Sequence, residues 1–97
     1  MKRARRGDVV EVEWADSEHI ALGWASTSAY VKAASAPQAY RTAGYWIGGA
    51  TGHVLIALSI DPANRHITHA MSIPRAVIRK TTVLGRASKR VRKALRP

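Results

Sequence analysis

The sequence has no cysteine, few acidic residues and no long apolar run. The absence of cysteine excludes disulfide bonds and thiolate metal sites, and it fits a reducing cytoplasm. No stretch approaches the ~18 consecutive apolar residues that a membrane-spanning helix needs. The positive run at the start leads into Glu11 and Glu13 rather than an apolar segment, which argues against a signal peptide. We therefore expect a cytoplasmic protein without a membrane span.

The chain of 97 residues has the length of one small domain. A chain of this size buries one modest core, so a second domain is not expected. Hydrophobic residues make up 46% of the sequence and three are tryptophan, which is enough for a folded centre. No internal repeat is present.

The net charge of +10 lies at the two ends of the chain. Residues 1–6 carry four Lys or Arg, and residues 86–97 carry six with no acid. Residues 7–85 carry six basic and six acidic residues, so this part is neutral. Terminal blocks of like charge stay solvated and commonly act as interaction arms. We predict a basic arm over residues 1–6, a folded domain over residues 7–85, and a basic tail over residues 86–97.

The pattern of the neutral part is mainly β. Val10, Val12 and Trp14 alternate with two glutamates, which is typical of a strand with one wet face over residues 7–14. Further strands are predicted over residues 41–48, 53–60, 65–73 and 78–84, with the apolar run 53–60 as the central buried strand. The segment DPAN, residues 61–64, has the composition of a β-turn. Pro74 cannot donate to a strand ladder, so a single 3₁₀ turn is expected before the last strand.

One short helix is predicted over residues 26–35, between the first and second strands. Ser26 or Thr27 can cap it, and Pro37 ends it. A helix of this length is not stable alone, so we expect it to dock on the rest of the protein, with Tyr30 among the docking residues.

Five short antiparallel strands in a chain of this length favour a sheet that curls into a small barrel, because closure limits exposed edges. A 3₁₀ turn before the last strand is typical of SH3-like barrels, and a helix near the barrel mouth is common in Sm-like ones. The predicted fold is therefore a five-stranded SH3-like or Sm-like barrel with one short helix after the first strand and basic terminal arms.

The segments GDVVEVEWADS, GW, GYWIG, VLIALS and MSIPRAVI resemble small SH3-like or Sm-like proteins encoded by phages of actinobacteria. The resemblance covers roughly residues 7–84. It implies the barrel fold and a host bacterial cytoplasm as the location. These motifs are mostly core-forming, so the resemblance implies little about chemistry.

A second likeness concerns residues 54–74. The segment VLIAL, ten further residues, then HAMS and a proline resemble the end of bacterial Hfq, an Sm-like RNA chaperone. There, a His-Ala-x-Ser stretch lies near a uridine site, which implies that His69 contacts RNA. The Tyr-Lys pair that precedes the histidine in Hfq is Ile67-Thr68 here. The alternative is that His69 is an ordinary strand residue.

The tail over residues 86–97 is a candidate basic helix. Ala87, Val91, Ala94 and Leu95 share one side of a helical wheel, and the cations occupy the remainder. Basic segments of this kind bind nucleic acid through phosphate contacts that release counterions and depend little on sequence. Arg75, Arg79 and Lys80, around the 3₁₀ turn, are expected to extend this positive surface. The predicted nucleic-acid-binding residues are Lys2, Arg3, Arg5, Arg6, Arg75, Arg79, Lys80, Arg86, Lys89, Arg90, Arg92, Lys93 and Arg96.

Other partners for the basic arms stay open. An acidic protein surface would also attract them, and the N-terminal arm could contribute only long-range attraction. A membrane surface is disfavoured, because the tail has only Val91 and Leu95 as large apolar groups. Trp24 and Trp46 are the aromatic residues best placed to stack on bases, although packing is the alternative for both.

No catalytic or metal constellation stands out. His66 and His69 point to opposite faces of a strand and so cannot share a metal ion. Asp16, Ser17 and His19 are adjacent in sequence, whereas a catalytic triad converges from separate elements. We expect no enzyme activity, no cofactor and no bound metal.

The sequence therefore predicts a non-enzymatic nucleic-acid-binding protein, with DNA or RNA as the partner. The alternatives are a module that binds and modulates a host protein, or a minor virion or packaging component. Assembly into a homo-oligomer through strand edges stays open.

Overall fold

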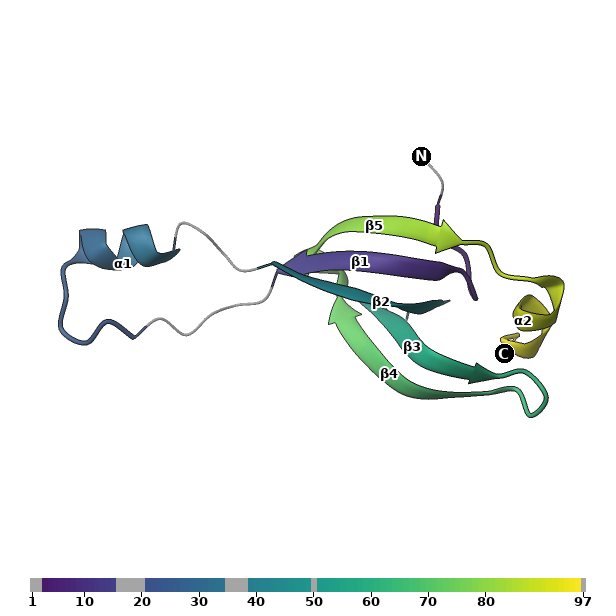
Figure 1. Cartoon of the computed structure of the whole chain (residues 1–97). Helices are drawn as coiled ribbons and strands as arrows, with labels where there is room; N and C mark the ends of the chain where they lie inside the picture. Colours follow the sequence, from purple (N-terminus) through teal and green to yellow (C-terminus); the bar gives the residue numbers. More distant parts are fainter. Residues whose placement is uncertain (1–2, 16–20, 35–38, 50, 97) are drawn as a thin grey trace.

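The computed structural model describes residues 3–15, 21–34, 39–49 and 51–96. It contains five strands, two α-helices and one 3₁₀ turn, so the mainly β prediction is confirmed (Figure 1). The strands are β1 (Val9–Ala15), β2 (Ala39–Gly48), β3 (His53–Asp61), β4 (His66–Pro74) and β5 (Ile78–Gly85). The helices are α1 (Thr27–Ala34) and α2 (Lys89–Ala94), and the 3₁₀ turn is η1 (Arg75–Val77).

The strands form one antiparallel sheet in the order β4-β3-β2-β1-β5. Among the described residues no ladder joins the two edge strands, so the sheet is not closed into a barrel and that part of the prediction is not confirmed. The chain passes between these edges through Pro74, which has no N–H to donate, and through η1, as expected. The middle strand is β2, so the predicted central position of β3 was wrong, whereas its predicted burial is confirmed by Val54, Ile56 and Ala57.

The core lies on one face of the sheet. Val10 and Val12 are fully buried, which confirms the alternation predicted for β1. They cluster with Val54 and Ile56 of β3 and with Ile73 of β4. Each buried side chain of this size stabilises the fold by roughly 1.5–3 kcal/mol relative to exposure.

The neighbouring strands approach closely at Gly44 of β2. A Cβ there would lie 2.7 Å from the carbonyl oxygen of Ala57 and 2.8 Å from Cγ2 of Ile56. Glycine is therefore required for β2 and β3 to pack around the core at this point.

Helix α1 forms where it was predicted, and the backbone N–H of Ala29 donates to Ser26 Oγ at 3.1 Å as a cap. The helix has no buried residue, and it lies apart from the sheet (Figure 1). The Tyr30 hydroxyl donates to the carbonyl of Gly23 at 2.7 Å and accepts from the N–H of Leu22 at 3.2 Å. Tyr30 therefore ties the helix to its own preceding loop, and the predicted docking on the rest of the protein is not observed among the described residues.

The turn between β3 and β4 forms around Asp61, as predicted. Its carboxylate accepts from the backbone N–H groups of Ala63 and Asn64 and from Asn64 Nδ2 at 2.8 Å. These bonds, led by that from the Asn64 side chain, lower the pKa of Asp61. Arg65 follows with a φ of 58°, in the left-handed region. The turn returns the chain close to α2 at one end of the sheet.

Candidate nucleic-acid interface

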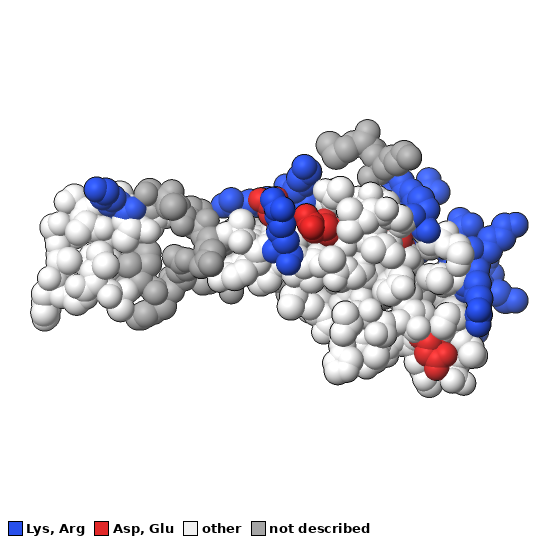
Figure 2. Space-filling model, in the orientation of Figure 1, with Lys and Arg blue, Asp and Glu red and all other residues white. Residues whose placement is uncertain are grey.

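Lysine and arginine side chains gather at the end of the molecule that holds α2 (Figure 2). We call this region the basic end. Its described cations come from the N-terminal segment, the β3–β4 turn and the C-terminal segment. They are Arg3, Arg5, Arg6, Arg65, Arg86, Lys89, Arg90, Arg92, Lys93 and Arg96. Lys2, which was predicted as part of the same site, lies outside the described residues.

Helix α2 presents its cations to solvent because its other side packs on the protein. Ala94 is buried and Val91 and Leu95 are half-buried, whereas the Lys and Arg residues of the helix are exposed. This agrees with the faces read from the sequence. Ser88 caps the helix, accepting at Oγ from the N–H of Val91 at 3.2 Å.

Helix α2 and the residue Ala87 before it pack against Gly7. Gly7 has a φ of 91°, and a Cβ at this position would lie 2.9 Å from Val91 Cγ1 and 3.0 Å from the Cβ of Ala87. Only glycine combines this backbone conformation with such close approach of a helix. The N–H of Gly7 also donates to the carbonyl of Trp46 at 2.6 Å, so the backbone on which α2 packs is hydrogen-bonded to β2.

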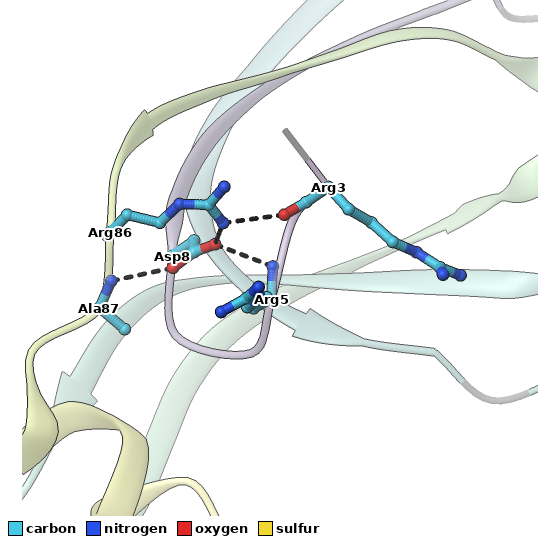
Figure 3. A network of polar contacts seen from close by, with 5 residues as sticks. All are labelled: Arg3, Arg5, Asp8, Arg86 and Ala87. Atoms are coloured by element: carbon cyan, nitrogen blue, oxygen red, sulfur yellow. Dashed lines mark hydrogen bonds and ion pairs between the residues drawn. The ribbon is translucent and has the colours of Figure 1, made fainter. Parts of the chain in front are cut away.

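A buried carboxylate fastens the two basic segments together (Figure 3). Asp8 is only 2% exposed, and Arg86 Nη1 lies 2.7 Å from its Oδ2. The backbone N–H of Ala87 donates to Oδ1 at 2.9 Å, and that of Arg5 donates to Oδ2 at 2.8 Å. Arg86 Nη1 also donates to the carbonyl of Arg3 at 2.8 Å. We call these five residues the Asp8 network.

The Asp8 network keeps its carboxylate ionised. Burial by itself raises the pKa of Asp8, but hydrogen bonds from the N–H groups of Ala87 and Arg5 and the Arg86 guanidinium lower it by more. The resulting pKa lies below the ordinary value for aspartate. At neutral pH the charge of Arg86 is therefore largely offset, and Arg86 acts as a structural cation.

Sequence reasoning missed Asp8 and Arg65. Asp8 is the first acid of the chain and is separated from the basic residues 1–6 only by Gly7, which is a signal for an ion pair with one of the two basic segments. Arg65 gave no such signal, because its position beside α2 depends on how the β3–β4 turn lies in space.

Arg6 is the N-terminal cation whose side chain contacts the sheet. Arg6 Nε donates to the carbonyl of Ile47 at 2.8 Å, and the Arg3 guanidinium points away from Asp8 in Figure 3. Arg75 lies near the same part of β2, since a Cβ on Gly49 would be 3.1 Å from its Nη2. Arg75 is therefore associated with the β2–β3 connection rather than with α2.

Arg79 and Lys80 do not join the positive surface of α2, contrary to the sequence-based expectation. They lie near the start of β5, whereas α2 follows its far end. Lys80 pairs in register with Glu13 of β1, and directly paired residues share one face of a sheet. Acidic and basic residues accordingly lie together at the end of the sheet that faces α1 in Figure 2.

The candidate stacking residues differ in environment. Trp46 is half-buried and packs against the core, as the packing alternative supposed. Trp24 is fully exposed in the loop before α1. Trp14, predicted to be a core residue, packs against the core and donates from Nε1 to Thr42 Oγ1 at 3.0 Å.

His69 lies exposed in the edge strand β4 with a φ of 52°, which is unusual for a strand residue. Within the described part of the chain no three His, Asp or Glu side chains are grouped so that they could hold a metal ion. None of the described helices has the length and apolar character needed to cross a membrane.

A scan against protein-family models, a search of curated proteins and a search of solved structures each found no match to this chain.

Proposed function

We propose that this protein binds nucleic acid without catalysing a reaction, through contacts with phosphates that depend little on base sequence. The observation that carries the proposal is the exposed row of cations on α2. Among the described residues, no Lys or Arg of α2 forms an ion pair with an acidic side chain.

The Asp8 network supports this function because it holds the basic segments in fixed positions beside each other. Cations that are already ordered lose less conformational entropy on binding than cations on a free arm. Each phosphate that they neutralise releases condensed counterions, which gives affinity that falls steeply with salt. The proposed location is the host bacterial cytoplasm.

The test is binding of a labelled single-stranded RNA and a duplex DNA at several salt concentrations. We expect both to bind, with a steep linear dependence of log K on log salt. The double substitution Lys89→Gln and Arg92→Gln should reduce the slope by about 2, since each lost phosphate contact removes about one unit. The matched control, Arg79→Gln with Lys80→Gln, removes the same charge from the other end of β5 and should change the slope far less.

Substitution is preferable to truncation in this protein. Removal of residues 1–6 and 86–97 would delete Arg86 and Ala87 and leave Asp8 as a buried carboxylate without these partners. A loss of binding could then reflect unfolding. Absence of binding by the full chain below ~100 μM at moderate salt, weaker than ordinary non-specific binding, would contradict the proposal.

The relationship to SH3-like or Sm-like phage proteins belongs to the same proposal. The 3₁₀ turn directly before β5 and the five-stranded antiparallel sheet support it. A closed barrel would require pairing of β4 with β5. Interstrand contacts between Met71 or its neighbours and β5, measured by NMR, would test this closure.

A second candidate function is binding of a host protein through the α1 region. Trp24 is fully exposed, Leu22 and Val31 are exposed, and the helix has no buried residue. The expected result is a saturable complex with one host protein that Trp24→Ser weakens, while nucleic-acid binding is unchanged.

A further inference from the structure

A cleft of about 370 Å³ lies between the β3–β4 turn and α2. We call it the phosphate cleft. Its lining residues are Pro62, Ala63, Arg65, Arg90, Lys93, Ala94 and Arg96. Four of them are cations and none is an acid. The cleft therefore concentrates positive charge from two segments that are distant in sequence.

The geometry of α2 explains why two of these cations converge. Arg90 and Lys93 are three residues apart, so they lie on the same face of the helix. Ala94 is buried beneath them and lets the turn approach. The cleft thus has a small apolar floor and a charged rim.

Arg65 closes the cleft from the side of the turn. Its φ of 58° is rarely adopted by residues other than glycine, asparagine and aspartate. Its Nη2 donates to the carbonyl oxygen of Arg96 at 2.9 Å, which joins the turn to the end of α2. This bond uses one of five guanidinium N–H groups, so Arg65 keeps further donors for a ligand.

The positive charge of the cleft is not compensated within the described structure. None of its four cations forms an ion pair there. Asp61, the acid of the adjacent turn, accepts hydrogen bonds from Ala63 and Asn64 instead. Like charges gathered in one cleft repel each other, and a bound anion with several oxygens would relieve this repulsion.

We propose that the phosphate cleft is a discrete binding site for one phosphate group. This inference rests on the proposed function and deepens it, because it assigns one fixed anchor point within an otherwise diffuse basic surface. Arginine binds phosphate through paired parallel N–H donors, which gives such a site geometric definition as well as charge. The phosphate belongs either to the end of a nucleic-acid strand or to its backbone.

The first experiment is a titration of the full chain with inorganic phosphate, monitored by two-dimensional NMR. We expect saturable shifts at the residues that line the cleft. Arg90→Gln with Lys93→Gln should weaken phosphate binding by about tenfold or more, as expected for loss of charge-assisted hydrogen bonds. This variant retains the bond between Arg65 and Arg96. The matched control, Lys89→Gln with Arg92→Gln, removes the same charge from α2 outside this cleft and should weaken binding less than about threefold.

A second variant, Arg65→Gln, tests the turn side of the cleft. It should also weaken phosphate binding, and its thermal unfolding shows whether α2 has stayed in place. Equal losses in the cleft variant and the control would overturn the inference, because they would indicate a diffuse surface without a site.

Oligonucleotides with and without a 5′-phosphate identify the source of the phosphate. Tighter binding of the phosphorylated strand, lost in the cleft variant, assigns a strand end. Equal binding of both strands, with the cleft variant weaker for both, assigns the backbone. If inorganic phosphate binds in the cleft but neither RNA nor DNA binds the chain, the site stands and the proposed function fails. If nucleic acid binds but inorganic phosphate gives no saturable shifts, the function stands and the discrete site is refuted.

Discussion

The two α-helices of this protein are both too short to be stable alone, yet their surroundings differ completely. Helix α2 has six residues and packs Val91 and Ala94 on the body of the protein. Helix α1 has eight residues and none of them is buried. The shorter helix is thus the better docked one. The difference teaches that tertiary partners, here Gly7 and the Asp8 network, decide whether a short helix becomes part of the fold.

The largest expected effect concerns the network that fastens α2. Asp8→Asn removes the carboxylate that accepts from Arg86, Ala87 and Arg5. We expect a loss of about 2–3 kcal/mol in the free energy of unfolding, because the substitution removes a buried, ionised carboxylate that accepts three hydrogen bonds. Urea denaturation monitored by tryptophan fluorescence measures it. Asp61→Asn, in the exposed turn, is the control and should lose less; equal losses would show that the Asp8 network does not fasten α2.

Gly7→Ala, compared with a control glycine, should distinguish the contribution of α2 packing at Gly7 from that of the positive φ at this position. The added methyl group would lie 2.9 Å from Val91 Cγ1, and φ is 91°. We expect a loss of about 2 kcal/mol, from left-handed backbone strain and overpacking together. Gly52→Ala provides the matched control, because Gly52 has a φ of 79° with nothing within 4 Å of a Cβ. It should lose only about 1 kcal/mol from the backbone; if the two variants are equally destabilised, α2 does not press on Gly7.

Acidic pH should destabilise the folded protein, because it protonates Asp8 and weakens the network that holds α2. The pKa of Asp8 is lower in the folded protein than its ordinary value, so folding favours the ionised form. Its contribution to stability is therefore complete above about pH 4–5, the unfolded range for aspartate, and is lost as the pH falls through the folded pKa. Melting temperatures measured between pH 7 and pH 2 should fall toward acid. In Asp8→Asn the fall should be smaller and reflect Asp61, whose pKa is also lowered; an unchanged profile in this variant would refute the assignment.

The smallest effect is expected at α1. Trp24 is fully exposed, so Trp24→Ser should change the free energy of unfolding by no more than about 0.5 kcal/mol. Urea denaturation of this variant beside Asp8→Asn would show whether the two ends of the molecule differ as strongly as their packing indicates. A loss above 1 kcal/mol would mean that α1 docks on the sheet in solution.

Local patterns predicted much of the fold. The alternation of Val10 and Val12 with glutamates indicated β1, and Ser26 indicated the start of α1. The turn at Asp61 and the 3₁₀ turn after Pro74 followed from residues that fix their own backbone. Strand order was less accessible, because β2 rather than the more apolar β3 lies at the centre of the sheet.

The candidate site was predicted in composition but not in arrangement. The cations of residues 86–97 were evident, and so was the helical face that α2 turns toward the protein. The prediction that Arg79 and Lys80 lie beside these cations was wrong. Closeness along the chain does not reveal that the length of β5 separates the two residues from α2. Pairing of Lys80 with Glu13 likewise depends on strand register.

The sequence by itself determined the elements that depend on neighbours along the chain: strand periodicity, helix caps, turns and the charge of the two terminal segments. The tertiary structure alone decided which distant residues meet. It brought Asp8 to Arg86 across 78 positions, and it placed Arg65 beside Arg90. The physical reason is that the ion pair and the cleft depend on separations through space, which the sheet sets, whereas periodicity and capping depend on separations along the backbone.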